Sequence, residues 1–143
     1  MEAEFSGPPL KIGLCTVGST GDIQPFLALG KELMRLGHDV LAVSHPFHAS
    51  RFASVGIPFA GCGPFVEQAE LNALLDKMML VRNPVKQLEV LMKEAFFKDG
   101  LTYFKAAQLA LAGRELVVAH SIDFIGQQAA ATLGIPRIGV VLT

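Results

Sequence analysis

Residues 10–40 read LKIGLCTVGSTGDIQPFLALGKELMRLGHDV, and this stretch decides the fold. It opens with a short apolar run at 10–17 that is closed by Gly18, a pattern typical of a strand buried on both faces. After a polar turn at 18–22, large apolar side chains recur every three or four residues as far as Gly37, a residue type that commonly stops a helix. The stretch therefore predicts a strand, a glycine-rich turn and a helix.

Pro25 limits where the predicted helix can begin. Proline has no amide hydrogen, so it is tolerated in the first turn of a helix, where that hydrogen would have no intrahelical acceptor. We therefore expect the helix to begin at about Ile23 or Gln24.

The rest of the chain repeats the alternation of strand and helix. Residues 64–113 have helical periodicity and predict two or three helices, with breaks near Pro84 and Gly100. Further strands are expected at 39–44, 57–60, 116–119 and 137–142, and further helices at 47–55 and 124–133. This order requires parallel strands joined by right-handed crossovers, so the expected fold class is α/β, a doubly wound, Rossmann-like parallel sheet with helices on both faces.

Composition limits the functions that the chain can have. Its 143 residues suit one domain, and 51% apolar against 17% charged residues indicates an extensive buried core rather than disorder. The net charge of -1 does not indicate a nucleic-acid partner. Cys15 and Cys62 lie in apolar segments without metal-ligand spacing, so we expect buried free thiols and no metal site.

The two ends of the chain carry their own expectations. Residues 1–9 have neither a basic nor an apolar region, so they are interpreted as a disordered or linker segment rather than a signal peptide. No apolar run reaches the length of a membrane span, and a cytoplasmic location is expected, with a peripheral membrane contact left open. Thr143 directly follows a predicted central strand and is interpreted as the boundary of a truncated or split protein.

Sheets of this class bind ligands beyond the carboxyl ends of their strands. The segments that follow the first four predicted strands are 18–22, 44–47, 61–65 and 120–123. The functional residues are therefore sought in these segments.

Two nucleotide-binding motifs compete for the turn at 18–22. A P-loop has the spacing of Gly13 and Gly18 but requires lysine where Ser19 stands. A dinucleotide fingerprint requires a leading glycine, which the turn lacks, and an acidic residue at the end of the second strand, which is also missing. A nucleotide-binding or reductase-type Rossmann domain stays open as an alternative.

A third pattern fits better. It consists of GSTGDIQP at 18–25, ALGKEL at 28–33 and RLGHDV at 35–40, with GIP at 134–136 before the last predicted strand. In these motifs the chain resembles the N-terminal domain of GT-B glycosyltransferases of the sterol glucosyltransferase, glycopeptide glycosyltransferase and rhamnosyltransferase kind, a family 28-type domain. The resemblance covers about residues 11–143 and is weak in the middle.

The resemblance implies a two-domain enzyme that moves a sugar from a nucleoside diphosphate sugar to an acceptor hydroxyl on a lipid, sterol or natural-product aglycone. Residues 10–143 would form the acceptor-binding domain, and the C-terminal donor-binding domain is absent from this sequence. The implied partner is that domain, in the same protein or as a separate catalytic chain, and the isolated chain is expected to be inactive. No cofactor beyond the sugar donor is implied, and no metal, since the sequence has no DxD pattern.

Within this resemblance Asp22 matches the family's loop aspartate and is the expected catalytic base for the acceptor hydroxyl. The alternative is that Asp22 is only the N-cap of the helix. Gly18, Ser19, Thr20 and Gly21 are the expected contacts to the donor diphosphate, because helix N-termini favour anions. The alternative for these residues is a tight turn that needs its glycines.

Three residues are candidates for acceptor binding. His120 follows a predicted strand and could orient the acceptor, while Phe47 and Phe65 could line an apolar groove. A structural role is the alternative for each of them. The same two readings apply to residues at helical spacing in the middle of the chain, namely Met78, Met79, Phe96 and Phe97. A non-catalytic, ligand-binding subunit of a split glycosyltransferase remains the second functional hypothesis.

Overall fold

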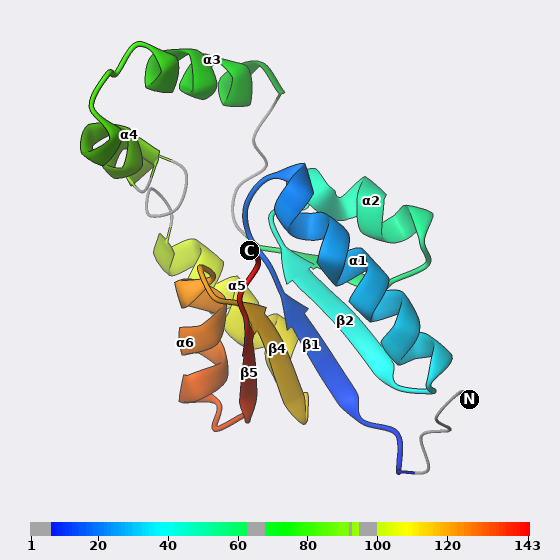
Figure 1. The fold of residues 1–143 in the computed structure, drawn as a ribbon. Coiled ribbons are helices and arrows are strands. Elements are labelled where there is room, and N and C mark those ends of the chain that lie inside the picture. Colours follow the sequence, from blue (N-terminus) through cyan, green and yellow to red (C-terminus); the bar gives the residue numbers. More distant parts are fainter. Residues whose placement is uncertain (1–6, 63–67, 92, 95–99) are drawn as a thin grey trace.

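The computed structural model describes residues 7–62, 68–91, 93–94 and 100–143 (Figure 1). Its strands are β1 (Lys11–Cys15), β2 (Asp39–Ser44), β3 (Phe59–Gly61), β4 (Leu116–His120) and β5 (Arg137–Val140). Its helices are α1 (Thr20–Arg35), the 3-10 helix η1 (Pro46–His48), α2 (Ala49–Ser54), α3 (Gln68–Met79), α4 (Pro84–Leu91), α5 (Gly100–Leu111) and α6 (Phe124–Thr132).

All five strands form one parallel sheet in the order β3-β2-β1-β4-β5. β1 lies at the centre, where Ile12 pairs with Val40 of β2 and with Leu116 of β4. The chain adds strands outward on one side of β1 and then crosses over to build the other side, which is the doubly wound order. The expected fold class is confirmed.

Helices cover both faces of the sheet, and each face has its own core (Figure 1). Side chains alternate along a strand, so Ile12 and Leu14 of β1 point to one face and Cys15 to the other. α1 and α2 cover the first face through Phe26 and Phe52, which are buried. The second face is covered by buried residues of α5 and α6, namely Tyr103, Ala107, Leu111, Ala129 and Ala130.

α1 begins earlier than the sequence predicts. It starts at Thr20, so Pro25 lies in its second turn. The proline removes one hydrogen bond, the one that would reach back to the carbonyl of Gly21. Gly21 is exposed, so water can serve that carbonyl. The predicted start at Ile23 or Gln24 is therefore wrong, because one bond lost at an exposed helix end does not stop the helix.

The other end of α1 agrees with the prediction. Gly37 has φ +91°, and its amide donates to the carbonyl of Met34 at 3.0 Å. The amide of His38 donates to the carbonyl of Leu33 at 3.1 Å. These two bonds form a Schellman motif, which satisfies the last helix carbonyls and turns the chain into β2.

The middle of the chain forms three helices within the described residues, and the break predicted near Pro84 is confirmed. The break predicted near Gly100 falls at residues 95–99, which lie outside the described residues. The side chain of Asn83 accepts hydrogen bonds from the amides of Val85 and Lys86, so α4 begins at Pro84. α3 and α4 extend away from the sheet, whereas α5 lies beside α6 (Figure 1). The single helix predicted at 47–55 is instead a turn of 3-10 helix followed by α2.

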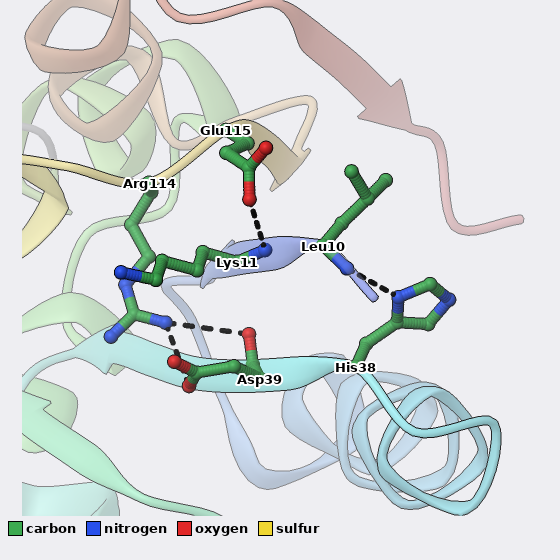
Figure 2. Close-up of polar contacts among 6 residues, drawn as sticks. All are labelled: Leu10, Lys11, His38, Asp39, Arg114 and Glu115. Carbon is green, nitrogen blue, oxygen red and sulfur yellow. Dashed lines mark hydrogen bonds and ion pairs between the residues drawn. The ribbon is translucent and has the colours of Figure 1, made fainter. Parts of the chain in front are cut away.

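Polar contacts tie neighbouring strands together at the amino edge of the sheet (Figure 2). Glu115 accepts a hydrogen bond from the amide of Lys11 at 3.1 Å, and Arg114 forms an ion pair with Asp39 at 2.9 Å. These contacts connect the start of β1 and the start of β2 to the residues that precede β4. The candidate residues in the segments 18–22, 44–47 and 120–123 lie at the opposite, carboxyl edge.

Candidate functional site

The turn between β1 and α1 stands at the carboxyl edge of the sheet, flanked by the ends of β2 and β4. Strand pairing of β1 ends at Cys15, and α1 begins at Thr20. Between them Gly18 has φ +120°, a conformation that side chains with a Cβ atom rarely adopt. The glycine therefore allows the chain to leave the strand and enter the helix within a few residues.

Ser19 and Asp22 hold each other in this turn. Oδ2 of Asp22 accepts hydrogen bonds from the amide and from the hydroxyl of Ser19, both at 2.8 Å. Ser19 is the N-cap of α1 and Asp22 is the third residue of the helix, so the N-cap role considered for Asp22 is wrong. Asp22 is instead the partner that reaches back to the N-cap amide in a capping box.

The environment keeps Asp22 ionised. Partial burial raises the pKa of Asp22, but the hydrogen bonds from Ser19 and the attraction of His120 outweigh it, and the net pKa lies below the ordinary value of 3.8. The residue is partly exposed. At neutral pH the turn thus presents a negatively charged carboxylate at the carboxyl edge of the sheet.

Two buried histidines contact the backbone of this turn. Nε2 of His48, a side chain that is 3% exposed, lies 3.0 Å from the carbonyl oxygen of Gly18. Nδ1 of His120, which is 4% exposed, lies 3.3 Å from the carbonyl oxygen of Val17. The sequence carries no motif that marks His48. The structure directs one ring nitrogen of His120 to the turn, and an acceptor contact by this residue remains a prediction.

A second carboxylate, Asp123, is buried at the same edge. It is the N-cap of α6, and its Oδ1 accepts a hydrogen bond from the amide of Gly126 at 2.9 Å. Burial raises the pKa of Asp123 to about 6, against the opposing effects of that hydrogen bond and of His120. Asp123 belongs to none of the sequence motifs above, although an aspartate directly before a predicted helix is an N-cap signal.

Several buried polar atoms near this edge have no hydrogen-bond partner among the described residues. They are Oγ1 of Thr16, Nδ1 of His48, the hydroxyl of Tyr103 and Oδ2 of Asp123. Burial, with a smaller effect of Asp123, also raises the pKa of Tyr103. Cys15 and Cys62 are buried free thiols, as the sequence predicts.

Of the aromatic candidates, the structure describes Phe47. Phe47 is partly buried in η1, where its ring lies 5.3 Å from that of His48 and 5.7 Å from the guanidinium of Arg51. Phe65 lies outside the described residues, as do Phe96 and Phe97. Met78 and Met79 lie in α3, where the side chain of Met79 is 82% exposed and is not part of the core.

In 7–62, 68–91, 93–94 and 100–143, no three side chains of His, Cys, Asp or Glu come together as a metal site. No helix in the described parts of the chain is long and apolar enough to cross a membrane.

Known proteins resemble this chain over most of its length. A sterol 3-beta-glucosyltransferase of Cryptococcus neoformans var. neoformans serotype D is 30% identical over 141 residues, which cover 93% of this chain and 8% of that protein. One of Pichia angusta is 51% identical over 62 residues, 43% of this chain and 5% of that protein. The chain spans less than a tenth of the length of these two relatives.

Solved structures share the fold. The Streptomyces sp. SF2575 glycosyltransferase SsfS6 superimposes with a TM-score of 0.72 at 22% identity, over 92% of this chain and 39% of SsfS6. The MurG protein of Acinetobacter baumannii gives a TM-score of 0.60 at 18% identity, over 92% of this chain and 34% of MurG. At such identities the likeness concerns the fold, which is that of the N-terminal, Rossmann-like half of GT-B glycosyltransferases.

The family model for this half matches the chain directly. Residues 12–137 match the glycosyltransferase family 28 N-terminal domain, and this range contains the turn, both histidines and both carboxylates described above. The range also contains β2, β3 and β4, all of β1 except its first residue, and the first residue of β5. The chain therefore belongs to the glycosyltransferase family 28 N-terminal domain family.

Proposed function

We propose that this chain is the acceptor-binding half of a glycosyltransferase in which Asp22 is the general base. The observation that carries the proposal is the position of Asp22: an ionised, partly exposed carboxylate in the turn that leaves the central strand at the carboxyl edge. Ligands of doubly wound sheets bind at this edge. Family membership supports sugar transfer as the reaction.

The proposed reaction needs a base at this place. The acceptor oxygen forms a bond to the anomeric carbon of the donor sugar while the bond from that carbon to the diphosphate breaks, and the nucleoside diphosphate leaves. The acceptor proton passes to the carboxylate of Asp22. A positioned carboxylate contributes about 10²-fold to 10⁴-fold through such a transfer. The lowered pKa of Asp22 makes it a weaker base, but keeps it in the deprotonated form that is needed.

The start of α1 is the proposed contact to the donor diphosphate. Thr20 and Gly21 are exposed first-turn residues, and first-turn amides have no intrahelical acceptor. The amide of Ser19 already donates to Asp22, so it is not available to a phosphate oxygen. Thr20 and Gly21 are therefore the better candidates, because the single hydrogen of the Ser19 hydroxyl is also donated to Asp22.

The proposed acceptor is a sterol, another lipid or a natural-product aglycone. The relatives above are named sterol 3-beta-glucosyltransferases, which supports an apolar acceptor with one reactive hydroxyl. The proposed partner is a donor-binding domain, in the same protein or in a second chain, because the matched family domain is the N-terminal one.

An Asp22→Asn substitution tests the proposal, in this domain joined to its donor-binding domain. Asparagine keeps an oxygen that can accept from the Ser19 amide, so the capping box survives while the base is lost. The expected result is a decrease in kcat of about 10²-fold or more. The matched control is Asp39→Asn at the opposite edge, which removes an exposed carboxylate and leaves kcat unchanged. A kcat for Asp22→Asn within about threefold of the wild-type value would remove Asp22 from the mechanism.

A peripheral membrane contact is a separate proposal, and one feature of the fold supports it. The tip formed by the end of α3 and the start of α4, residues 77–88, contains three basic residues and no acidic one. Its apolar side chains are strongly exposed: Met79 82%, Leu80 84%, Val85 74% and Leu88 58%. Apolar side chains flanked by basic ones suit the interface of an anionic bilayer.

A further inference from the structure

We propose that His48 and His120 are positioning residues of the candidate site, which hold the turn after β1 from both sides and so determine where Asp22 lies. The link to catalysis rests on the function proposed above. We call the two hydrogen bonds, from His48 to the Gly18 carbonyl and from His120 to the Val17 carbonyl, the clamp. The clamp does not depend on that function. Neither histidine is assigned a contact to substrate by this proposal.

Three successive carbonyl groups leave the strand ladder at the end of β1, and each is contacted by a buried side chain. The carbonyl of Thr16 accepts from the hydroxyl of Ser44, which ends β2. The next two carbonyls, those of Val17 and Gly18, lie 3.3 Å from Nδ1 of His120 and 3.0 Å from Nε2 of His48. β2 and β4 are the two neighbours of β1, so the side chains reach the turn from both sides.

The chemistry of these contacts determines which ring nitrogen carries hydrogen. A carbonyl oxygen only accepts, so Nε2 of His48 and Nδ1 of His120 must be the protonated nitrogens. Nδ1 of His48 is buried without a partner among the described residues, and a hydrogen there would have no acceptor. Burial lowers the pKa of His48, with Arg51 adding to this and Gly18 and Asp22 opposing it. The neutral ring with hydrogen on Nε2 fits this surrounding.

The position of the Asp22 carboxylate depends on the position of the turn, because the two are in close contact. A Cβ atom at Gly18 would lie 2.5 Å from Oδ2 of Asp22, so the backbone of Gly18 and this carboxylate touch. The same oxygen is bound by the amide of Ser19, the residue that follows. A shift of the Gly18 carbonyl therefore moves the carboxylate. Small misplacements of a catalytic group are costly, about 10²-fold for 1 Å.

The proposal is tested with variants that differ in one hydrogen-bond donor. His48→Gln and His120→Asn place a side-chain amide NH₂ near the positions of Nε2 and Nδ1, respectively, and retain the donor. His48→Leu and His120→Leu fill the same space without it. ¹⁵N NMR of the 143-residue chain reads the tautomers of both histidines, and ¹³C NMR of the carboxyl groups reads the pKa of Asp22. The folded state is checked from the amide spectrum of each variant.

The clamp predicts hydrogen on Nε2 of His48 and on Nδ1 of His120 in the wild-type chain. It also predicts shifted Ser19 and Gly21 amide signals in the leucine variants and signals close to wild type in the amide variants. The Asp22 pKa is compared in the His48 variants alone, because either substitution of His120 removes its attraction for Asp22. Opposite tautomers, or turn signals that are the same in leucine and amide variants, would overturn the clamp. Should the leucine variants fail to fold, the wild-type tautomers and the amide variants still decide the matter.

Kinetics of the domain joined to its donor-binding domain separates this proposal from the function on which it rests. We expect kcat to fall about tenfold to 10²-fold in the leucine variants, with the acceptor KM little changed, and to recover in the amide variants. Leucine variants with full kcat would overturn the positioning role. If the NMR results hold while Asp22→Asn retains activity, the clamp stands and the proposed base fails.

Discussion

At the residue scale, the carboxyl edge of the sheet holds two carboxylates in opposite electrostatic states. Hydrogen bonds from Ser19 lower the pKa of Asp22 in spite of its partial burial, whereas burial raises the pKa of Asp123 to about 6. His120 attracts both of them. Asp22 is thus the one prepared to be charged and accessible, and Asp123 is a buried cap that destabilises the fold when it ionises.

The raised pKa of Asp123 predicts a pH dependence of stability. In the folded chain the pKa is about 6 and in the unfolded chain about 3.8, so the folded state holds the proton more tightly. Its stabilising contribution is present below the unfolded value and is lost as the pH rises through 6. Asp123→Asn removes this dependence and keeps an oxygen for the Gly126 amide.

Urea unfolding of both proteins at pH 4 and pH 7 measures this effect. The free energy of unfolding of the wild type relative to Asp123→Asn should fall by about 2 kcal/mol between the two pH values, since one pKa unit corresponds to about 1.4 kcal/mol and the unfolded aspartate is already partly ionised at pH 4. A constant difference across this range would show that Asp123 titrates alike in the folded and unfolded chains.

Gly18 gives a second prediction at this scale. Alanine there must adopt φ +120° and would bring its Cβ within 2.5 Å of Oδ2 of Asp22. Gly18→Ala should lower the free energy of unfolding by about 1–3 kcal/mol through backbone strain. Gly139→Ala in β5 is the control, because a Cβ there meets nothing within 4 Å. Equal unfolding free energies for the two variants in denaturant titrations would contradict this account of the turn.

At the element scale, sequence patterns predict the ends of a helix or strand when neighbouring residues in the sequence determine those ends. The sequence predicts β2 at 39–44, and the strand occupies Asp39–Ser44; Gly37 ends α1 as expected. The start of α1 was mispredicted because the cost of Pro25 depends on whether the carbonyl it leaves unpaired is exposed. Solvent exposure is a property of the folded molecule, and it cannot be read from a proline at a given spacing.

The hairpin of α3 and α4 leads to a prediction about lipid surfaces. We expect the chain to sediment with vesicles that contain phosphatidylserine, and binding should weaken at high salt as Arg82 and Lys86 are screened, since Lys77 is already paired with Glu94. Leu80→Ser at the tip should weaken binding about tenfold to 10²-fold, because one buried leucine contributes about 1.5–3 kcal/mol. Leu80 is 84% exposed.

The control for this experiment is Leu109→Ser on α5, a leucine that is 82% exposed but lies away from the hairpin. It should bind vesicles as the wild type does. Equal loss in both variants would assign binding to general surface hydrophobicity. No sedimentation of the wild type with anionic vesicles would exclude the hairpin as a lipid contact.

At the scale of the whole molecule, the sequence determines the fold class better than it determines the site. Alternation of strands and helices was sufficient for the doubly wound sheet, and the 18–22 turn was found because it follows the first strand directly. The contacts that hold this turn join residues far apart in sequence, 30 positions for His48 and Gly18 and 103 for His120 and Val17. Such pairs become visible only when the topology brings β2 and β4 to either side of β1.

The central claim concerns the proton of the acceptor, and a series of acceptors tests it most directly. The ratio of kcat/KM for wild type and Asp22→Asn is measured in the domain joined to its donor-binding domain, with an alcohol, a phenol and a thiol that is already ionised at the assay pH. General-base catalysis predicts a ratio of about 10² or more for the alcohol that falls toward one for the ionised thiol, which has no proton to lose. A ratio that is the same for all three acceptors would contradict the account.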